Sequence, residues 1–280
     1  MRTETITSFD GSPIAIYSTG TGPGVVLLHG GGITELEYHR LAAALADRLT
    51  VHLYNRRGRP DTAPLTGDET VQTDLGDLAA VLRHTGADAI FGHSGGGFVA
   101  LRAGLGLPGE VPLRRIGVYD PALCISGRPS AAFLPAFEAA VAAGDQARAM
   151  TVMSRGVYPD DPAAKLPFGM AMQVTKAFML TPVGRRMSDL LPTTPPEIRR
   201  IYGHNGPAAD YADVTAEVLL AAGSRSPRYF TQNCEAVADA IPRGRALVLK
   251  GSHNAANIAR PAFVRPFADF FAGQGATAVA

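Results

Sequence analysis

Gly92-His93-Ser94-Gly95-Gly96 directly follows the short apolar run Ala89-Ile90-Phe91. A strand that ends in Gly-x-Ser-x-Gly and runs into a helix makes a sharp turn that exposes the serine hydroxyl. Glycines two places before and after the serine remove side chains that would collide there. The N-terminus of the following helix offers free N–H groups to an oxyanion. The pentapeptide therefore predicts a nucleophilic serine, although a plain glycine-rich turn could have the same sequence.

The flanking sequence alternates between strand and helix patterns. Asp10-Gly11 lies between two β-like runs and predicts a hairpin. Val25-Val26-Leu27-Leu28 suits a strand buried on both faces. Later strands are predicted at 51–54, 89–91, 115–119, 218–222 and 246–249, and helices at 34–49, 70–85, 94–105, 228–240 and 263–271. This alternation implies an α/β fold with a mostly parallel sheet flanked by helices.

The alternation breaks in the middle of the chain. Residues 124–206 contain helical stretches at 131–143, 147–154 and 170–180, interrupted by prolines and without a strand run. Open α/β sheets bind ligands at the carboxyl ends of their strands. We therefore expect 124–206 to form a helical cap insertion over that edge, with 1–123 and 207–280 as the core. An irregular surface excursion is the alternative.

Composition excludes several classes of protein. The 280 residues suit one large α/β domain with an insertion, and 26 basic against 25 acidic residues leave no basic excess for nucleic acid. The two cysteines, Cys124 and Cys234, form neither a metal-ligand spacing nor a disulfide framework. No segment approaches about 18 continuous apolar residues, and the N-terminus lacks a signal-peptide core. We expect a soluble cytoplasmic protein without a membrane contact, a metal or an organic cofactor.

A second glycine-rich stretch, His29-Gly30-Gly31-Gly32, follows the apolar run 25–28. Small residues there let backbone N–H groups approach a ligand oxygen. One oxyanion donor is expected in this loop and the other on the residue after the nucleophile, here Gly95. We take Gly31 as the donor in the loop, with Gly30 or Gly32 as alternatives. A merely flexible loop is the competing interpretation.

A serine nucleophile needs a base, and the chain has seven histidines. The order expected is nucleophile, acid, then a histidine on the loop after the last strand. His253, in Lys250-Gly251-Ser252-His253 after the strand at 246–249, fits this order. It could otherwise be a surface histidine. His29 and His93 adjoin the glycine motifs and are expected to be structural, while His204 lies in the insertion.

Together these motifs resemble the α/β-hydrolase family over nearly the whole chain. The matching pieces are His29-Gly30-Gly31, Tyr54-Asn55-Arg56-Arg57-Gly58-Arg59, Gly92-His93-Ser94-Gly95-Gly96 and Gly251-Ser252-His253. The resemblance implies an α/β-hydrolase fold and a serine catalytic triad. The Tyr54–Arg59 piece departs from the family pattern at Asn55 and Pro60. It is usually structural, and we assign it no catalytic role.

The sequence also departs from the family at the triad acid. The family commonly places that acid after the strand corresponding to 218–222, in a Gly-x-x-Asp turn, but here the turn reads Gly223-Ser224-Arg225-Ser226. Asp120 follows the strand at 115–119, where some family members place their acid. We predict Asp120 as the acid, with Asp210 and Asp213 as alternatives. Asp120 could instead only cap a turn.

The predicted activity is hydrolysis of a small-molecule ester, thioester or lactone through an acyl-enzyme intermediate. Two rivals stay open. One is an acyltransferase, cyclase or cofactor-free lyase on the same site, and the other is a non-catalytic ligand-binding homologue. Phe133, Phe137, Met172 and Phe178 suggest an apolar substrate chamber in the cap, or simply the cap's own core. The sequence leaves the oligomeric state undefined.

Overall fold

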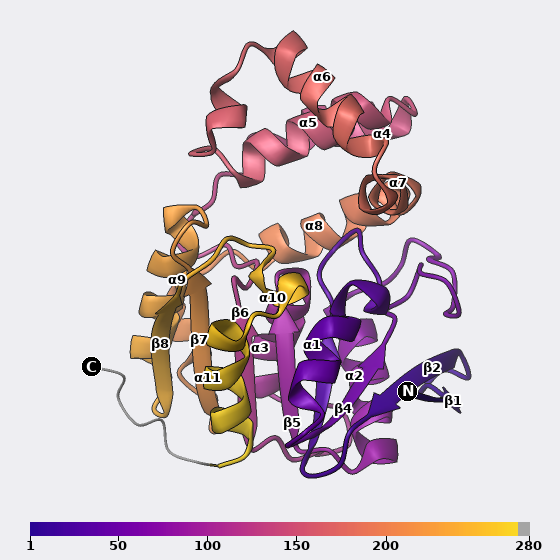
Figure 1. Ribbon diagram of the computed structural model, residues 1–280, viewed down its shortest axis with the longest axis vertical. Coiled ribbons are helices and arrows are strands. Elements are labelled where there is room, and N and C mark those ends of the chain that lie inside the picture. The colour runs from indigo at the N-terminus through magenta and orange to yellow at the C-terminus, as the bar shows by residue number, and fades with distance from the viewer. Residues whose placement is uncertain (274–280) are drawn as a thin grey trace.

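The computed structural model describes residues 1–273 and has a sheet-based core beneath a helical layer (Figure 1). One eight-stranded sheet has the order β1-β2-β4-β3-β5-β6-β7-β8. Neighbouring strands run parallel from β4 through to β8, whereas β1 and β2 form an antiparallel hairpin that pairs with β4. The strands are β1 (Arg2–Thr7), β2 (Pro13–Thr19), β3 (Gly24–Leu28), β4 (Thr50–Tyr54), β5 (Ala89–His93), β6 (Arg115–Tyr119), β7 (Glu217–Gly223) and β8 (Gly244–Leu249).

Helices cover both faces of the sheet, as a mostly parallel sheet requires. One face packs against α2 (Val71–Thr85), α3 (Gly95–Gly104) and α9 (Arg228–Ala240). The other face packs against α1 (His39–Leu45), α10 (Ala255–Ile258) and α11 (Pro261–Phe271). Side chains alternate between the two cores along each strand. The predicted fold class, a mostly parallel sheet flanked by helices, is therefore confirmed.

Local sequence signals set several helix ends. Thr34 and Glu37 form a capping box at the short 3-10 helix η1 (Glu35–Tyr38), which leads into α1. Thr70 caps α2, and Gly86 ends it in the left-handed conformation at φ 68°. These contacts fix the loops that enter and leave the sheet.

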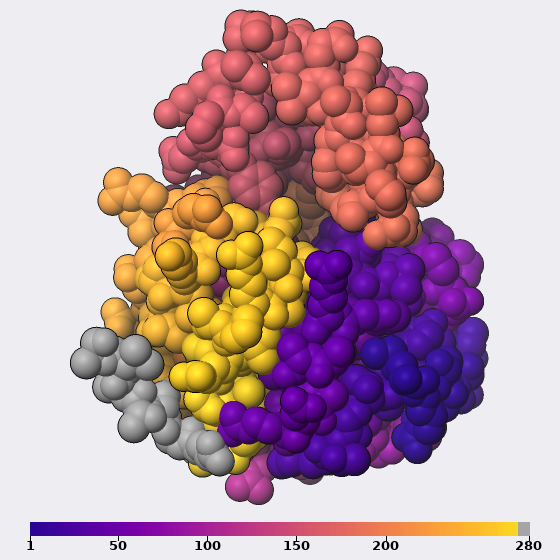
Figure 2. Space-filling view, in the orientation of Figure 1, coloured from indigo at the N-terminus to yellow at the C-terminus, as the bar shows by residue number. Residues whose placement is uncertain are grey.

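The insertion forms a separate layer of helices above the carboxyl ends of the strands, the upper lobe in Figure 2. Its ends meet, since the Ser126 N–H donates to the Gly206 carbonyl at 2.9 Å. It has a small core of its own around Phe137 and Met150. Its helices are α4 (Leu134–Ala142), α5 (Gln146–Val157), η2 (Pro162–Lys165), α6 (Phe168–Met179), α7 (Pro182–Asp189), η3 (Leu191–Thr193) and α8 (Thr194–Gly203); η4 (Ala208–Tyr211) follows.

Two cap helices lie where the prolines were expected only to interrupt structure. Pro182 begins α7, and Pro195 lies in the first turn of α8. A proline in the first helical turn loses no hydrogen bond, because the N–H groups there have no intrahelical partner. None of the helices within residues 1–273 combines the length and apolar character needed to cross a membrane.

Candidate active site

Ser94 lies at the turn between β5 and α3. Its φ of 53° is a strained value for a residue with a side chain. A Cβ on Gly92 would collide with the Gly96 carbonyl oxygen, and one on Gly96 would collide with the Leu28 carbonyl oxygen. The turn therefore needs glycine at both positions. It leaves Ser94 partly exposed at the carboxyl edge of the sheet.

The loop after β3 lies beside this turn. A Cβ on Gly95 would be 3.4 Å from the Gly31 nitrogen, so the two predicted amide donors are neighbours. His29 holds the loop, because its Nδ1 meets the Gly30 carbonyl at 2.7 Å and its Nε2 accepts the Arg56 N–H at 3.0 Å. Burial lowers the pKa of His29 well below its usual value, which keeps the ring neutral for both bonds.

His253 and Asp120 meet at the carboxyl end of the sheet. Asp120 follows β6 directly, is fully buried, and places Oδ2 at 3.1 Å from Nδ1 of His253. Its Oδ1 accepts the Gly223 N–H at 2.9 Å, and its Oδ2 accepts the Ser226 hydroxyl at 2.5 Å. Ser226 occupies the position where the resemblance predicts an acid. Its hydroxyl instead donates to the carboxylate of Asp120, which follows the adjacent strand β6. This arrangement can orient the His253 ring.

The alternative acids lie elsewhere. Asp210 belongs to η4 and Asp213 follows it, and both are exposed. The side chain of Asp210 packs against Gly206, at the end of the insertion. His204, the insertion histidine, packs edge-on against Phe98 in α3.

Aromatic rings enclose His253. The Phe230 ring stacks on it with centroids 5.3 Å apart, and Tyr158, just after α5 in the cap, meets it edge-on at 5.7 Å. The His93 ring lies 4.5 Å away. The cap therefore supplies part of the wall around the imidazole. Among the described residues no hydrogen bond joins the Ser94 hydroxyl to this ring; such bonds are often long in unliganded sites.

His93, adjacent to Ser94, has a structural contact on its far side. Its Nδ1 lies 2.6 Å from the Tyr38 hydroxyl, which also accepts the Gly30 N–H at 3.0 Å. Burial lowers the pKa of His93 well below its usual value, so the neutral ring accepts the Tyr38 proton. These hydrogen bonds link the predicted oxyanion loop to the residue before Ser94.

A buried charge cluster lies between the core and the start of α8. Arg56 donates to Glu197 Oε1 at 2.8 Å, and Arg59 donates to the same oxygen. Asp74 lies 3.8 Å from Arg56 and 3.6 Å from Arg200. Burial would raise the pKa of Glu197, but the charges of Arg56 and Arg59 hold that pKa below its usual value. Sequence reasoning did not identify Glu197; the dense arginine run at 55–59 was its only signal.

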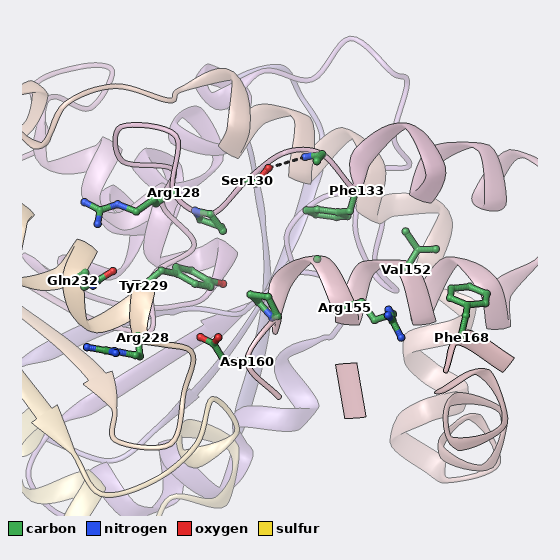
Figure 3. A pocket seen from close by; sticks show the side chains of 14 residues that line it. Arg128, Ser130, Phe133, Val152, Arg155, Asp160, Phe168, Arg228, Tyr229 and Gln232 are labelled. Carbon is green, nitrogen blue, oxygen red and sulfur yellow. Dashed lines mark hydrogen bonds between the residues drawn. The ribbon is translucent and has the colours of Figure 1, made fainter. Parts of the chain in front are cut away.

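A cavity of about 720 Å³ opens between the cap and α9 (Figure 3). Tyr229 and Gln232 line one side, and Phe133, Val152 and Arg155 line the other. Neither Ser94 nor His253 lines it. Tyr229, which lines the cavity, packs its ring on Phe230, and the Phe230 ring in turn stacks on the imidazole.

The predicted chamber residues have different environments. Phe133 lines the cavity, whereas Phe137 is buried in the cap's own core. Met172 is half-buried and Phe178 is 40% exposed on α6, and neither lines the cavity. For Phe137 the position matches the alternative of helix packing within the cap.

No group of three or more metal-binding side chains occurs within residues 1–273. Cys124 and Cys234 are both free and buried.

A sequence model described as the alpha/beta hydrolase family matches residues 25–267. The chain belongs to this family. An alpha/beta hydrolase from Sphaerobacter thermophilus is 29% identical, with a TM-score of 0.79 over 96% of this chain and 100% of that one. No curated protein matches the chain.

Two further solved structures share the fold at lower identity. An esterase from Exiguobacterium antarcticum is 18% identical, with a TM-score of 0.70 over 96% of this chain and 99% of that one. The enol-lactonase from Burkholderia xenovorans is also 18% identical, with a TM-score of 0.63 over 95% and 99%.

Proposed function

We propose that this family member is a serine hydrolase that cleaves an ester, thioester or lactone through an acyl-enzyme intermediate. His253 takes the Ser94 proton as the oxygen attacks the carbonyl, and Asp120 holds the ring tautomer and stabilises the imidazolium. The Gly31 and Gly95 amides bind the oxyanion, each contributing on the order of 3 kcal/mol to the transition state. His253 gives the Ser94 proton to the leaving alcohol or thiol as the intermediate collapses to the acyl-enzyme. It then takes a proton from the attacking water and passes it to Ser94 as the acid product leaves.

The contact between Asp120 Oδ2 and His253 Nδ1 at 3.1 Å carries this proposal. A base needs a partner that fixes its tautomer, and a buried carboxylate with two further donors is such a partner. The strained φ of Ser94 and the approach of Gly31 to Gly95 add support, because both cost conformational freedom that a plain turn does not need.

The non-catalytic alternative rested on the missing acid after β7. Asp120 supplies a carboxylate to His253 from the neighbouring strand. The absence of an acid after β7 therefore no longer favours a non-catalytic protein. The structural neighbours named as an esterase and an enol-lactonase act on the bond classes proposed here, at 18% identity.

The decisive experiment combines covalent labelling with turnover. A fluorophosphonate should label the wild-type protein at Ser94 and fail to label Ser94→Ala, while Ser12→Ala, in the distant hairpin, labels normally. Hydrolysis of an active ester in isotopically labelled water should place one solvent oxygen in the acid product. Labelling of Ser94 without solvent oxygen in the product would instead identify acyl transfer or elimination.

A further inference from the structure

The outer helices of the cap carry many exposed apolar side chains. Of the twelve most exposed large hydrophobic residues within 1–273, six lie between Phe168 and Val183. Single exposed apolar residues are normal on a protein surface, whereas a contiguous group of them marks a contact surface. Packing within the cap leaves this group uncovered, so the group is a candidate contact surface.

One side of α6 is apolar and faces away from the cap. Met170, Val174 and Phe178 are four residues apart and therefore lie along one side of the helix. They are 57%, 53% and 40% exposed. The next stripe faces α5, where the Thr151 hydroxyl donates to the Thr175 hydroxyl at 2.9 Å. α6 thus packs on α5 through one side and presents an apolar side to solvent.

The apolar surface continues beyond the end of α6. Leu180, which ends α6, is 73% exposed, and Val183 in the first turn of α7 is 39% exposed. α6 lies at the upper end of the molecule in Figure 1, in the lobe that stands above the core in Figure 2. A flat surface can therefore approach α6 without meeting the sheet or its helices. We call this surface the outer cap face; it consists of Met170, Val174, Phe178, Leu180 and Val183.

The charges of this segment have one sign. Residues 162–188 contain four basic residues and no acidic one. Arg186 is paired with a glutamate of the core at 2.6 Å. Lys165, Lys176 and Arg185 are exposed, and none of them has a carboxylate partner among the described residues. Three positive charges are thus available to an external partner.

Two of these basic side chains lie beside the outer cap face. Lys176 is one helical turn before Leu180, and Arg185 follows Val183 by two residues. Long basic side chains can lie along an apolar surface while their charged ends reach outward. The same region therefore offers apolar contacts and positive charge to one partner.

Neighbouring elements do not remove this positive excess. α5, packed beneath α6, adds Arg148 and Arg155, whose guanidinium groups lie over the Phe168 ring. The nearby acids Asp145 and Asp161 each accept a backbone N–H at the start of a helix. Over the whole insertion, 124–206, nine basic residues face six acidic ones, although the charges of the full chain nearly balance. The excess positive charge is therefore concentrated in the cap.

The partner must bury apolar side chains and carry negative charge. A second copy docked through the same face would bring Lys176 and Arg185 against like charges, with no acid in 162–188 to pair with them. An anionic lipid bilayer has an apolar acyl layer beneath negative phosphates, which matches both features. We propose that the outer cap face binds the protein to the surface of an anionic lipid membrane, with α6 lying in the plane of that surface.

This proposal replaces the expectation that the protein makes no membrane contact. That expectation rested on the lack of a long apolar run and of a signal-peptide core. Binding at the surface requires neither, because an amphipathic helix enters only the boundary between headgroups and acyl chains.

Co-sedimentation with lipid vesicles tests the proposal without any turnover, so it succeeds or fails separately from the hydrolase function. One set of vesicles is phosphatidylcholine alone, and the other contains about 30% phosphatidylglycerol to give a negative surface. Each basic residue near such a surface contributes about fivefold to binding, so three give a preference of roughly 100-fold for the anionic vesicles. Roughly 0.5 M sodium chloride should reduce that preference at least tenfold. Binding to the two sets within twofold would overturn the proposal.

A matched pair of variants locates the apolar contact. Val174→Asp places a charge in the outer cap face, and Val248→Asp makes the same change on β8, where the valine is 50% exposed rather than 53%. We expect Val174→Asp to weaken binding to the anionic vesicles tenfold or more and Val248→Asp to leave it within twofold of the wild type. Equal losses in the two variants would overturn the role of the outer cap face.

A second pair tests the charge. Lys176→Glu combined with Arg185→Glu should lower the preference for anionic vesicles at least 20-fold. Arg40→Glu combined with Arg265→Glu makes the same change in net charge at exposed residues of α1 and α11, and should keep that preference within about threefold. A similar loss in both double variants would mean that net charge alone drives binding, and it would overturn the site.

Analytical ultracentrifugation separates the proposed partner from a second copy. We expect Val174→Asp to leave the sedimentation of the protein unchanged in the absence of vesicles. A wild-type dimer that Val174→Asp dissociates, together with equal binding to both vesicle sets, would assign the outer cap face to self-association and overturn the membrane proposal. Urea unfolding midpoints near that of the wild type would show that the variants are folded, and the comparison of the two vesicle sets with the wild-type protein needs no variant.

Discussion

Replacing Asp120 with asparagine changes the proposed triad with very little change in the shape of the side chain. The Gly223 N–H points at Oδ1 and can only donate, so the new amide must keep its oxygen at that position. Its NH2 group then occupies the Oδ2 position and faces the Ser226 hydroxyl and His253 Nδ1. The hydroxyl can rotate to accept, but Nδ1 must give up its proton. The ring is therefore held with its proton on Nε2, and it cannot act as a base toward Ser94.

The expected loss in kcat is on the order of 10³ to 10⁴, the size found when a triad histidine is held in the wrong tautomer. Stability should change much less, because the bonds to Gly223 and Ser226 persist with altered polarity. We expect the urea unfolding midpoint to stay close to that of the wild type, which separates a catalytic from a structural role for Asp120.

Single-turnover labelling of Ser94 by a fluorophosphonate and steady-state ester hydrolysis both measure this loss. Asp210→Asn and Asp213→Asn serve as matched controls and should turn over normally. Turnover of Asp120→Asn within about tenfold of the wild type would refute the assignment of Asp120. A large loss in Asp210→Asn or Asp213→Asn would point to that residue instead.

A second substitution tests whether a carboxylate from the end of β7 can replace that of Asp120. Ser226 Oγ lies 2.5 Å from Asp120 Oδ2, so a carboxylate at position 226 can reach the same region. Adding Ser226→Asp to Asp120→Asn should restore activity by tenfold or more, since the asparagine can donate to the new carboxylate. Failure of this rescue, with the fold intact, would mean that the carboxylate must come from β6.

Three further results are expected. Ser94→Ala should lower turnover by about 10⁴ to 10⁶ while the protein stays folded; activity within tenfold would exclude a serine nucleophile. Ser226→Ala should lower kcat by roughly tenfold with little effect on KM, because Asp120 loses one of the donors that orient it; an unchanged kcat would show that this hydroxyl does not matter. Burial lowers the pKa of His29, His52 and His93 in the folded state, so the unfolded chain binds more protons below about pH 6.5 and stability falls with acidity. The free energy of unfolding should fall from pH 7 to 5.5 in urea titrations, and a flat profile would contradict the buried neutral rings.

Periodic apolar patterns predicted the core helices well. The helix at 228–240 has those bounds in the structure, and the predicted helix at 70–85 begins one residue later, after the Thr70 cap. Each of these helices buries one apolar face against the sheet, so the pattern and the packing agree. The glycine motifs likewise predicted the turn at Ser94 and the glycine-rich loop at Gly31.

The cap was harder to predict because its packing is mostly within itself. The sequence predicts breaks at Pro182 and Pro195, although each lies in a first helical turn. Phe137 and Phe178 are both apolar, yet one is buried in the cap core and the other is 40% exposed. Nothing in the spacing of these residues distinguishes the two environments.

The contact between Glu197 and the arginines could not be predicted from the sequence. Glu197 lies 141 residues from Arg56, in a segment without strand periodicity, and its carboxylate comes close to Gly31 only through the packing of α8 on the core. The charge run at 55–59 signals that carboxylates must be nearby, since buried arginines need partners. It does not say which of the 25 acidic residues supplies them.

The position of Asp120 follows from strand order, which explains how the proposed triad acid can follow β6 instead of β7. β6 and β7 are parallel neighbours with Tyr119 opposite Ala221, so both strands end at the same edge of the sheet. The Gly223 N–H and the Ser226 hydroxyl, from the end of β7, donate to the carboxylate from β6. The fold thus keeps a carboxylate site that two strand ends can reach. A triad in this family is better identified from the distance to the histidine ring than from the position of an acid in a motif.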